Sequence, residues 1–369
     1  MRFVIISNEF FNIYNFRHKL ILKLIDKYPN LNIHIIARYD GFQSLIQPIS
    51  RNITTHNLNI NSRSYSLINN LKTFLNIFFL IFKINPSLII SYTIKPNFFC
   101  SLLKIFFNFK LITNVTGLGE VYLNKSFFHS YLFKVYKKLL TFSNFVICQN
   151  FSDVSLFNGS KSKLNTKLVL IKGSGVDLLK FRHTKLSLNK KISFTFIGRI
   201  IPEKGIIEFL KAIIKFNRVY PNQASFTIIG KKYPENIKFN RQFDHYLKIS
   251  RSLYINSFVE PYSFIKSSTC IVLPSYREGL SRVLLESLSV GRILVATNVP
   301  GCSELINNNY NGFKVTPKSY NSIFNSLVKV LRFDKKKLIN MGYKSRLKSI
   351  KYSDHVVNSE LIQLINRVI

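Results

Sequence analysis

Short apolar runs alternate with longer amphipathic runs along almost the whole chain, and this alternation is what most constrains the fold. The run Leu88-Ile89-Ile90 is apolar at every position, which is typical of a strand covered on both faces. In residues 16–28 the apolar residues instead recur at helical spacing, with Leu20 and Leu24 on one face. Strands that alternate with helices indicate βαβ units and parallel sheets.

Two series of strands are predicted, separated by a stretch with two glycines, Gly173-Ser174-Gly175. We expect the strands of the first series at 3–7, 33–37, 88–92, 110–114, 145–148 and 168–171. Those of the second are expected at 193–197, 225–229, 270–273, 293–296 and 312–315. The sequence therefore predicts an α/β protein made of two Rossmann-like, doubly wound domains.

The length of 369 residues suits two domains better than one. We expect a first domain at 1–180, a second at 181–350, and a C-terminal helix at 351–369 that packs back on the first domain. Ligands of such sheets bind beyond the carboxyl ends of the strands. The functional loops should therefore be those that follow strands, and they should face a cleft between the domains.

The cysteines exclude two classes of protein. Cys100, Cys148, Cys270 and Cys302 lie far apart and form no C-x-x-C pair. This spacing excludes a zinc ribbon and argues against a disulfide scaffold, so a reducing cytosol is expected. No metal site is predicted. Hydrophobic residues make up 47% of the chain, which excludes general disorder.

The chain is strongly basic, with 53 Lys and Arg against 17 Asp and Glu. The excess is shared equally by the two parts that meet at Lys185, so the amino-acid usage of an AT-rich genome is one explanation. One segment still differs from the rest, because residues 41–119 contain no Asp or Glu but hold basic residues among runs of Phe. This pattern suits an anionic membrane surface. Core helices with solvated lysines are the alternative, and no cluster typical of nucleic-acid binding is present.

Two apolar runs bear on the location of the protein. The run at the N-terminus, residues 3–7, is too short for a signal peptide, so we expect a cytoplasmic protein. The most apolar run, residues 71–84, is shorter than the about 20 residues of a spanning helix. A peripheral position on the cytoplasmic face of the inner membrane is therefore predicted.

Gly198-Arg199 to Lys204-Gly205 follow a predicted strand and open a helix. The glycines allow the backbone to approach a ligand closely. Two fixed cations at this position would hold a diphosphate, Arg199 by its planar fork and Lys204 as a point charge. A solvated turn is the alternative for this loop taken alone.

A second informative loop follows the strand predicted at 270–273. Glu278 ends the loop, and Gly279, Leu280 and Ser281 are expected at the N-terminus of a helix, where free N–H groups attract phosphate. Glu286 lies about two turns into that helix, among apolar residues. A buried carboxylate needs partners, and ribose hydroxyls would be suitable donors. A structural salt bridge is the alternative for Glu286.

These loops together resemble the retaining family 4 glycosyltransferases, which have the GT-B fold. Glu278 and Glu286 match the family's E-x7-E signature, and residues 198–205 match its G-R-x4-K-G motif. The stretches 15–17, 93–97 and 114–119 are similar to bacterial members that add an N-acetylhexosamine to a polyprenyl-diphosphate-linked sugar.

The resemblance implies roles for individual residues. Arg199 and Lys204 would bind the diphosphate of a nucleotide-sugar, expected to be a UDP-sugar, and Glu278 would contact the donor sugar; these three would be the catalytic residues. Glu286 would bind the ribose. The remaining donor-binding residues would be Gly198, Gly279, Leu280 and Ser281, and the acceptor-side residues would be Arg17, Lys95, Asn97, Thr116, Gly117 and Gly119. The paired cations would replace a metal ion, so no cofactor is expected.

The resemblance also implies the partners. We expect a nucleotide-sugar donor, a lipid-linked glycan acceptor and an anionic inner-leaflet surface, in the synthesis of lipopolysaccharide O-antigen, capsule or a glycoprotein glycan. The other hypotheses are a GT-B sugar-nucleotide 2-epimerase and a basic membrane- or nucleic-acid-binding protein without transferase activity. The loop at residues 7–14 lacks the paired glycines that many relatives have there.

Overall fold

The computed structural model describes residues 1–46, 49–61, 66–118, 126–158, 164, 166–187, 191–257 and 260–369. Contacts within the chain divide it into two compact units. The first comprises Met1–Ser174 and Val357–Ile369, and the second comprises Gly175–Val356. The assignment of acceptor binding to the first domain and donor binding to the second stays a prediction.

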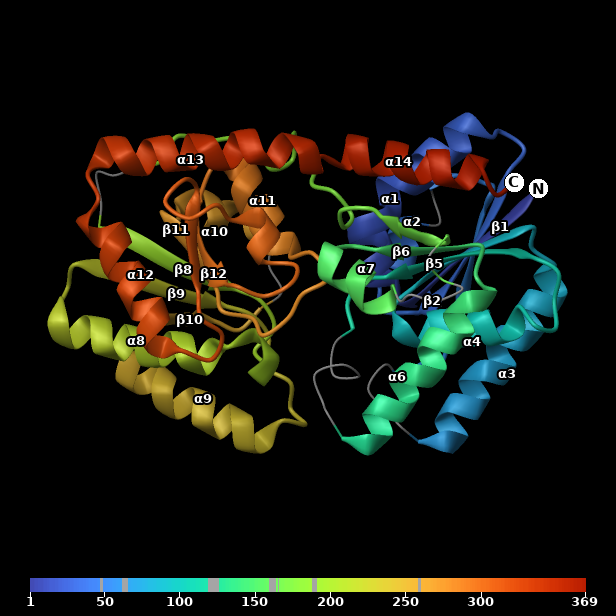
Figure 1. Ribbon diagram of the computed structural model, residues 1–369, viewed down its shortest axis with the longest axis horizontal. Helices are drawn as coiled ribbons and strands as arrows, with labels where there is room; N and C mark the ends of the chain where they lie inside the picture. The colour runs from blue at the N-terminus through green and yellow to red at the C-terminus, as the bar shows by residue number, and fades with distance from the viewer. Residues whose placement is uncertain are drawn as a thin grey trace. The chain divides into compact units, whose positions relative to one another are not determined.

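The first unit is built on a parallel sheet with the strand order β3-β2-β1-β4-β5-β6-β7 (Figure 1). Its strands are β1 (Arg2–Glu9), β2 (Asn32–Arg38), β3 (Ile53–Asn57), β4 (Leu88–Tyr92), β5 (Lys110–Val115), β6 (Phe145–Cys148) and β7 (Leu168–Leu170). Its helices are α1 (Phe10–Lys27), α2 (Gln43–Ile46), α3 (Leu67–Ile84), α4 (Ile94–Leu103), α6 (Phe127–Leu139), the 3-10 helix η2 (Leu140–Phe142), α7 (Phe151–Phe157) and most of α14 (Asp354–Asn366).

The strand β1, one of the inner strands of this sheet, is buried on both faces. In β1, Phe3 and Ile5 pack in one core cluster, whereas Val4 and Ile6 pack in another. Successive side chains of a strand point to opposite faces, so a strand that is apolar throughout needs cover on both sides. This explains why continuous apolar runs mark the inner strands.

The second unit has the strand order β10-β9-β8-β11-β12-β13, again with parallel pairing. Its strands are β8 (Ile192–Ile197), β9 (Ala224–Ile229), β10 (Leu253–Ile255), β11 (Cys270–Leu273), β12 (Ile293–Thr297) and β13 (Gly312–Val315). Its helices are η3 (Pro202–Lys204), α8 (Ile206–Val219), α9 (Ile237–Ser250), α10 (Pro261–Ser267), α11 (Arg282–Val290), η4 (Ser303–Leu305), α12 (Tyr320–Arg332), α13 (Lys335–Ser349) and η5 (Ile350–Tyr352). The predicted fold class, two doubly wound α/β domains, is confirmed by these sheets.

Two edge strands and one helix start differ from the prediction. The strands β3 and β10 were not predicted, because β3 reads Ile-Thr-Thr-His-Asn and β10 has only three residues, so neither contains a continuous apolar run. The prediction of a loop at residues 7–14 is wrong, because β1 ends at Glu9 and α1 begins at Phe10. The first strand and helix are therefore joined without the glycine-rich turn of many relatives.

The helix α3 is longer than the apolar run from which it was predicted. It spans 18 residues, which makes it long and apolar enough to cross a membrane by length and composition alone. A single helix of this kind is weak evidence for a span, because core helices pass the same test.

The last helix, α14, completes the core of the first unit (Figure 1). Its residues Leu361 and Leu364 are buried among side chains of β1 and α1, and Asn366 accepts a hydrogen bond from Lys27 Nζ at 3.0 Å. The first unit is therefore assembled from two separate segments of the chain.

Removing one buried side chain of α14 should destabilise the protein. Leu361→Ala is expected to lower the free energy of unfolding by about 2–5 kcal/mol, because it leaves a cavity in the core. Urea unfolding followed by circular dichroism measures the change. Glu360→Ala, on the exposed side of the same helix, is the matched control and should cost little. Equal midpoints for the two variants would show that α14 is only loosely attached.

Candidate donor site in the second unit

The second sheet has one place where the strand order reverses, between β8 and β11. In parallel α/β sheets, ligands bind beyond the carboxyl ends of the strands on either side of such a reversal. The loops that follow these two strands are 198–205 and 274–281. They contain every donor-binding residue predicted from the sequence except Glu286, which lies on the helix that follows the second loop.

The two loops touch through their backbones. Tyr276 N donates to Glu203 O at 2.8 Å. Gly205 has a φ of +66°, and a Cβ on it would lie 2.1 Å from Pro274 O. Only glycine fits both this conformation and this approach. Gly205, the end of the predicted G-R-x4-K-G motif, is therefore where the loops meet.

A third loop, following β12, holds the second loop from the other side. Glu278 N donates to Pro300 O at 3.1 Å, and Ser281 N donates to Gly301 O at 2.9 Å. Gly301 has a φ of +78°, and a Cβ there would lie 2.5 Å from the carbonyl oxygens of Glu278 and Gly279. The loop carrying Glu278 is thus fixed by backbone contacts on both sides.

These contacts correct the prediction for the start of the helix. The helix α11 begins at Arg282 with Ser281 as its N-cap, so Gly279 and Leu280 precede it. The amide of Ser281 already donates to Gly301 O and is not open to a phosphate. The backbone amides that the helix leaves without an intrahelical partner are those of its first turn, from Arg282 onward.

Lys204 and Glu278 are brought into direct contact. Lys204 Nζ lies 2.5 Å from Glu278 Oε1, and the two side chains are only 18% and 15% exposed. An ammonium group has three donors, and a carboxylate has two oxygens. Lys204 therefore keeps two N–H groups and Glu278 keeps Oε2 for a ligand at this edge of the sheet.

Arg199 lies in the loop after β8 and is exposed. Within the part of the chain that the structure describes, its guanidinium forms no hydrogen bond or ion pair. The adjacent Gly198 N donates to Ile229 O at 3.0 Å, which fixes the start of the loop. The structure thus presents a fixed backbone with an uncommitted cation beside the Lys204–Glu278 pair.

Glu286 is buried, and its partner was not foreseen. Its Oε1 accepts from Arg282 Nε at 2.8 Å, one helical turn earlier, and Arg282 Nη1 donates to Gly175 O. Burial raises the pKa of Glu286, and the neighbouring Arg282 opposes that rise. The i,i+4 spacing of the two residues could have revealed the pair. The salt-bridge alternative thus describes the unliganded protein, and the ribose role stays a prediction.

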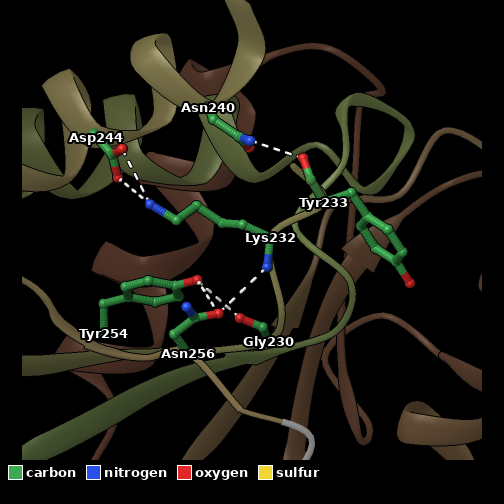
Figure 2. A network of polar contacts seen from close by, with 7 residues as sticks. All are labelled: Gly230, Lys232, Tyr233, Asn240, Asp244, Tyr254 and Asn256. Atoms are coloured by element: carbon green, nitrogen blue, oxygen red, sulfur yellow. Dashed lines mark hydrogen bonds and ion pairs between the residues drawn. The ribbon is translucent and has the colours of Figure 1, made fainter. Parts of the chain in front are cut away.

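A polar network next to these loops was missed by the sequence reasoning (Figure 2). Tyr254 Oη donates to Gly230 O at 3.0 Å and to Asn256 Oδ1 at 3.1 Å. Lys232 Nζ lies 2.9 Å from Asp244 Oδ1 on α9. Ile200, in the loop after β8, forms a parallel bridge with Lys232. Burial and Asp244 raise the pKa of Tyr254 to about 12, so its hydroxyl stays a donor at neutral pH. The network holds the loop after β9 beside the donor loops.

The predicted acceptor-side residues lie in the first unit in different environments. Arg17 is buried, and its Cζ lies 4.2 Å from the centroid of the Tyr92 ring. Lys95 Nζ donates to Asn61 O at 2.7 Å and to Asn70 Oδ1 at 2.9 Å. Thr116 and Gly117 are half-buried in the loop after β5. Gly119 lies outside the described residues.

Asn97 is a correction, because it belongs to the core rather than to an open loop. It is 0% exposed and accepts from Ser91 Oγ at 2.8 Å. Its Nδ2 donates to Asn114 O at 3.0 Å and to Tyr136 Oη at 3.1 Å. These contacts link Asn97 to β4, β5 and α6. Asn97 therefore stabilises the positions of the elements next to the predicted acceptor-side loops.

Three buried hydroxyl groups lie at the reversal point of the first sheet, between β1 and β4. Tyr92 Oη, Thr93 Oγ1 and Ser7 Oγ are buried there without a hydrogen-bond partner among the described residues. Thr93 has a φ of +73°, a strained conformation for a β-branched residue. Strain and unsatisfied polar atoms concentrate at functional sites. No sequence pattern predicts the strain or the unsatisfied hydroxyls, because both arise from the tertiary structure.

The described residues contain no group of three or more His, Cys, Asp or Glu side chains that could hold a metal ion. The basic side chains of the two loops are Arg199, Lys204 and Arg277.

Comparison with known proteins finds a family match within the second unit. Residues 179–348 match the family model described as "Glycosyl transferases group 1". The chain is 23% identical to the N,N'-diacetylbacillosaminyl-diphospho-undecaprenol alpha-1,3-N-acetylgalactosaminyltransferase of Campylobacter jejuni, covering 100% of this chain and 99% of that protein. It is 32% identical over 170 residues to the UDP-Gal:alpha-D-GlcNAc-diphosphoundecaprenol alpha-1,3-galactosyltransferase of Escherichia coli, covering 42% and 43% of the two chains. It is also 23% identical to the capsular polysaccharide biosynthesis glycosyltransferase CapM of Staphylococcus aureus, covering 91% and 90%.

Solved structures match the whole chain. Sucrose-phosphate synthase from Thermosynechococcus elongatus has a TM-score of 0.83 at 17% identity, covering 100% of this chain and 99% of that one. Anabaena HepE in complex with UDP and glucose has a TM-score of 0.80 at 14% identity, covering 100% of both. At these identities the likeness concerns the fold, which is GT-B.

Substitution of Gly301 should disturb the loop that carries Glu278. Gly301→Ala is expected to lower the free energy of unfolding by about 2 kcal/mol or more, because left-handed strain of about 1–2 kcal/mol adds to a clash with two carbonyl groups. Asn309→Ala is the matched control, since Asn309 also has a positive φ but is exposed. Urea unfolding of both variants measures the two losses in free energy of unfolding, and their difference is the contribution of the clash at Gly301. Equal losses would show that backbone strain alone accounts for the effect.

Proposed function

We propose that this glycosyltransferase, whose residues 179–348 form a Glycosyl transferases group 1 domain, transfers a sugar from a UDP-sugar to a polyprenyl-diphosphate-linked glycan. The sugar proposed is an N-acetylhexosamine, and the pathway is surface polysaccharide or glycoprotein glycan synthesis. The observation that carries the proposal is the half-buried Lys204–Glu278 contact at the reversal point of the second sheet, in loops that also carry the exposed Arg199. The names of the Campylobacter and Escherichia relatives support the choice of acceptor.

The donor is held by charge and by carboxylates. Arg199 and the two remaining N–H groups of Lys204 bind the diphosphate, assisted by the N-terminus of α11. Glu278 Oε2 accepts a hydrogen bond from a hydroxyl of the donor sugar. Glu286, which Arg282 holds in place, accepts from the ribose. Glu286 is buried and Glu278 is half-buried, which strengthens these hydrogen bonds because water competes less there.

The reaction needs stabilisation of the leaving group more than it needs a nucleophile from the protein. The bond between the anomeric carbon and the diphosphate oxygen breaks, and the acceptor hydroxyl forms the new bond on the same face, so configuration is retained. The hydroxyl proton passes to the departing phosphate oxygen. Arg199 and Lys204 neutralise the charge that develops on the diphosphate, which is often the largest catalytic contribution in such reactions. We propose that these two cations do this without a metal ion.

The acceptor is proposed to bind in the first unit, at the reversal point between β1 and β4. Tyr92 and Thr93 place buried hydroxyls there that have no hydrogen-bond partner in the described part of the chain, and Arg17 lies against the Tyr92 ring. Hydroxyl and guanidinium groups suit a sugar diphosphate. Because such an acceptor is anchored in lipid, we propose that the protein acts at the cytoplasmic face of the inner membrane.

The function is tested by incubating the protein with a panel of UDP-sugars and a short polyprenyl-diphosphate-linked N-acetylhexosamine. We expect one UDP-N-acetylhexosamine to give an extended lipid-linked product with the donor's anomeric configuration, seen by NMR coupling constants, and undiminished turnover in EDTA. Arg199→Ala and Lys204→Ala should each lower kcat about 100-fold or more. An inverted product, or turnover abolished by EDTA, would contradict the mechanism.

Glu286→Gln should separate stability from catalysis. The pKa of Glu286 is raised in the folded state, so folding favours the protonated carboxyl, and that contribution to stability is lost as the pH rises through the raised pKa. At neutral pH the neutral amide avoids the cost of burying a charge, so we expect a melting temperature equal to or above that of the unaltered protein. Affinity for UDP should fall about tenfold or more, because a charged acceptor is lost. Thermal unfolding with and without UDP measures both effects, and unchanged UDP affinity would remove the ribose role.

A further inference from the structure

The helix α3 exposes an apolar face of unusual size. On a helix that turns about 100° per residue, its exposed apolar side chains fall within an arc of roughly 120°. The residues of this arc are Leu67, Ile68, Leu71, Leu75, Phe79 and Phe82. Phe79 and Phe82 are 63% and 68% exposed. We call this set the α3 arc.

The rest of the helix shows that the α3 arc is not part of the core. Ile77, Ile81 and Ile84 are buried and pack against the first sheet, on the opposite side of the helix. Lys72 and Lys83 are exposed and border the arc on the helical wheel. The helix is therefore apolar on two faces, only one of which the protein covers. Large exposed apolar patches mark interaction surfaces.

Neighbouring segments extend the apolar surface. Phe78 of α3 contacts Phe107, with ring centroids 5.0 Å apart, and the adjacent Ile105 and Phe106 are 52% and 65% exposed. Figure 1 shows α3, α4 and α6 on the same side of the first sheet. The helix α6 begins with exposed Phe127 and Phe128. The surface thus consists of the α3 arc with aromatic residues from two further segments.

The charges around this surface identify its partner. Residues 41–119 contain no Asp or Glu, while Lys72, Lys83 and Lys110 are exposed. The segment that contains α3 carries exposed basic residues and no acidic ones, and such an apolar surface suits a bilayer with anionic headgroups. Two copies of the chain facing each other through the α3 arc would instead bring four lysines together, with no carboxylate from this segment to offset them.

We propose that α3 lies in the plane of the membrane interface and inserts the α3 arc among the acyl chains of one leaflet. This rests on the proposed function, because it supplies the contact that brings a lipid-linked acceptor to the first unit. The helix does not cross the bilayer: Ile77, Ile81 and Ile84 hold its other face in the core, and β4 follows closely after Asn85. The apolar arc, rather than lysine charge alone, is the main anchor.

This differs from docking by charge as the sequence suggested it. Lys104 is one of the basic residues of the acid-free segment 41–119, for which the sequence predicts contact with an anionic membrane surface. In the structure its Nζ donates to Phe109 O and lies 5.3 Å from the centroid of the Phe109 ring, so it is engaged within the protein. The remaining lysines steer the surface to anionic lipid, and the side chains of the α3 arc retain it there.

The chain has no Trp, so a single introduced Trp reports on its own surroundings. The full-length variant Phe79→Trp is mixed with vesicles of phosphatidylcholine and phosphatidylglycerol. We expect a blue shift of its fluorescence and stronger quenching by lipids brominated near the headgroup end of the acyl chain than by lipids brominated near its tail. Leu253→Trp, at a site 60% exposed in the second unit, is the matched control and should not shift.

Vesicle flotation measures the strength of anchoring. Phe79→Ser with Phe82→Ser should weaken binding about tenfold or more, and the binding of the unaltered protein should persist in high salt. Ile237→Ser with Leu253→Ser, two exposed apolar residues of the second unit, should bind like the unaltered protein. Unchanged melting temperature and unchanged affinity for UDP show that the variants are folded.

Four results would overturn the proposal. The first is vesicle flotation that is unaffected by the substitution of Phe79 and Phe82, and the second is vesicle binding that high salt abolishes. The third is fluorescence quenching of Leu75→Trp that is strongest with lipids brominated near the acyl tail, which would indicate a spanning helix. The fourth is a dimer, detected by light scattering, that the substitution of Phe79 and Phe82 dissociates. Vesicle binding is measured without substrates. A protein that binds vesicles but transfers no sugar would contradict only the proposed function, and the reverse result would contradict only the membrane contact.

Discussion

The close backbone contact between strand-following loops is the constraint on which the donor site depends. Parallel strands bring their carboxyl ends to one edge of a sheet, but they do not by themselves bring the loops into contact. Gly205 and Gly301 do so, because each lets one loop approach a carbonyl group of the next. Glu278 consequently lies on a loop held by hydrogen bonds to the loops after β8 and β12. The position of its carboxylate is thus set by backbone geometry before any ligand is present.

The charged side chains on these loops are the second feature of the candidate site. Lys204 and Glu278 neutralise each other in a half-buried position, which limits the cost of holding two charges away from water. Arg282 serves Glu286 in the same way. Arg199 has no such partner among the described residues, so an exposed cation lies in the loop where the diphosphate is proposed to bind. An incoming anion is attracted without first breaking an internal ion pair.

The sequence predicted the parts of the protein that local patterns encode. Inner strands were predicted because burial on both faces makes them continuously apolar. The motif residues Lys204, Glu278 and Gly205 lie where the strand-following loops meet, and their role in ligand binding stays a prediction. The edge strands β3 and β10 were not predicted, because an edge strand need not be apolar at every position. Asn97 was misjudged, because its motif gave no sign that it is buried. The strain at Thr93 and the pairing of Tyr254 with Gly230 and Asn256 depend on segments distant in the chain, which no local pattern reports.

The separation of α14 from the rest of the first unit has a consequence for biosynthesis. Residues 357–369 follow the entire second unit in the chain, yet they fill the core beside β1 and α1. On the ribosome, the first unit therefore lacks part of its interior until the second has been translated. Its apolar groove remains open during that interval, and a chaperone that shields such surfaces would engage the nascent first unit rather than the second.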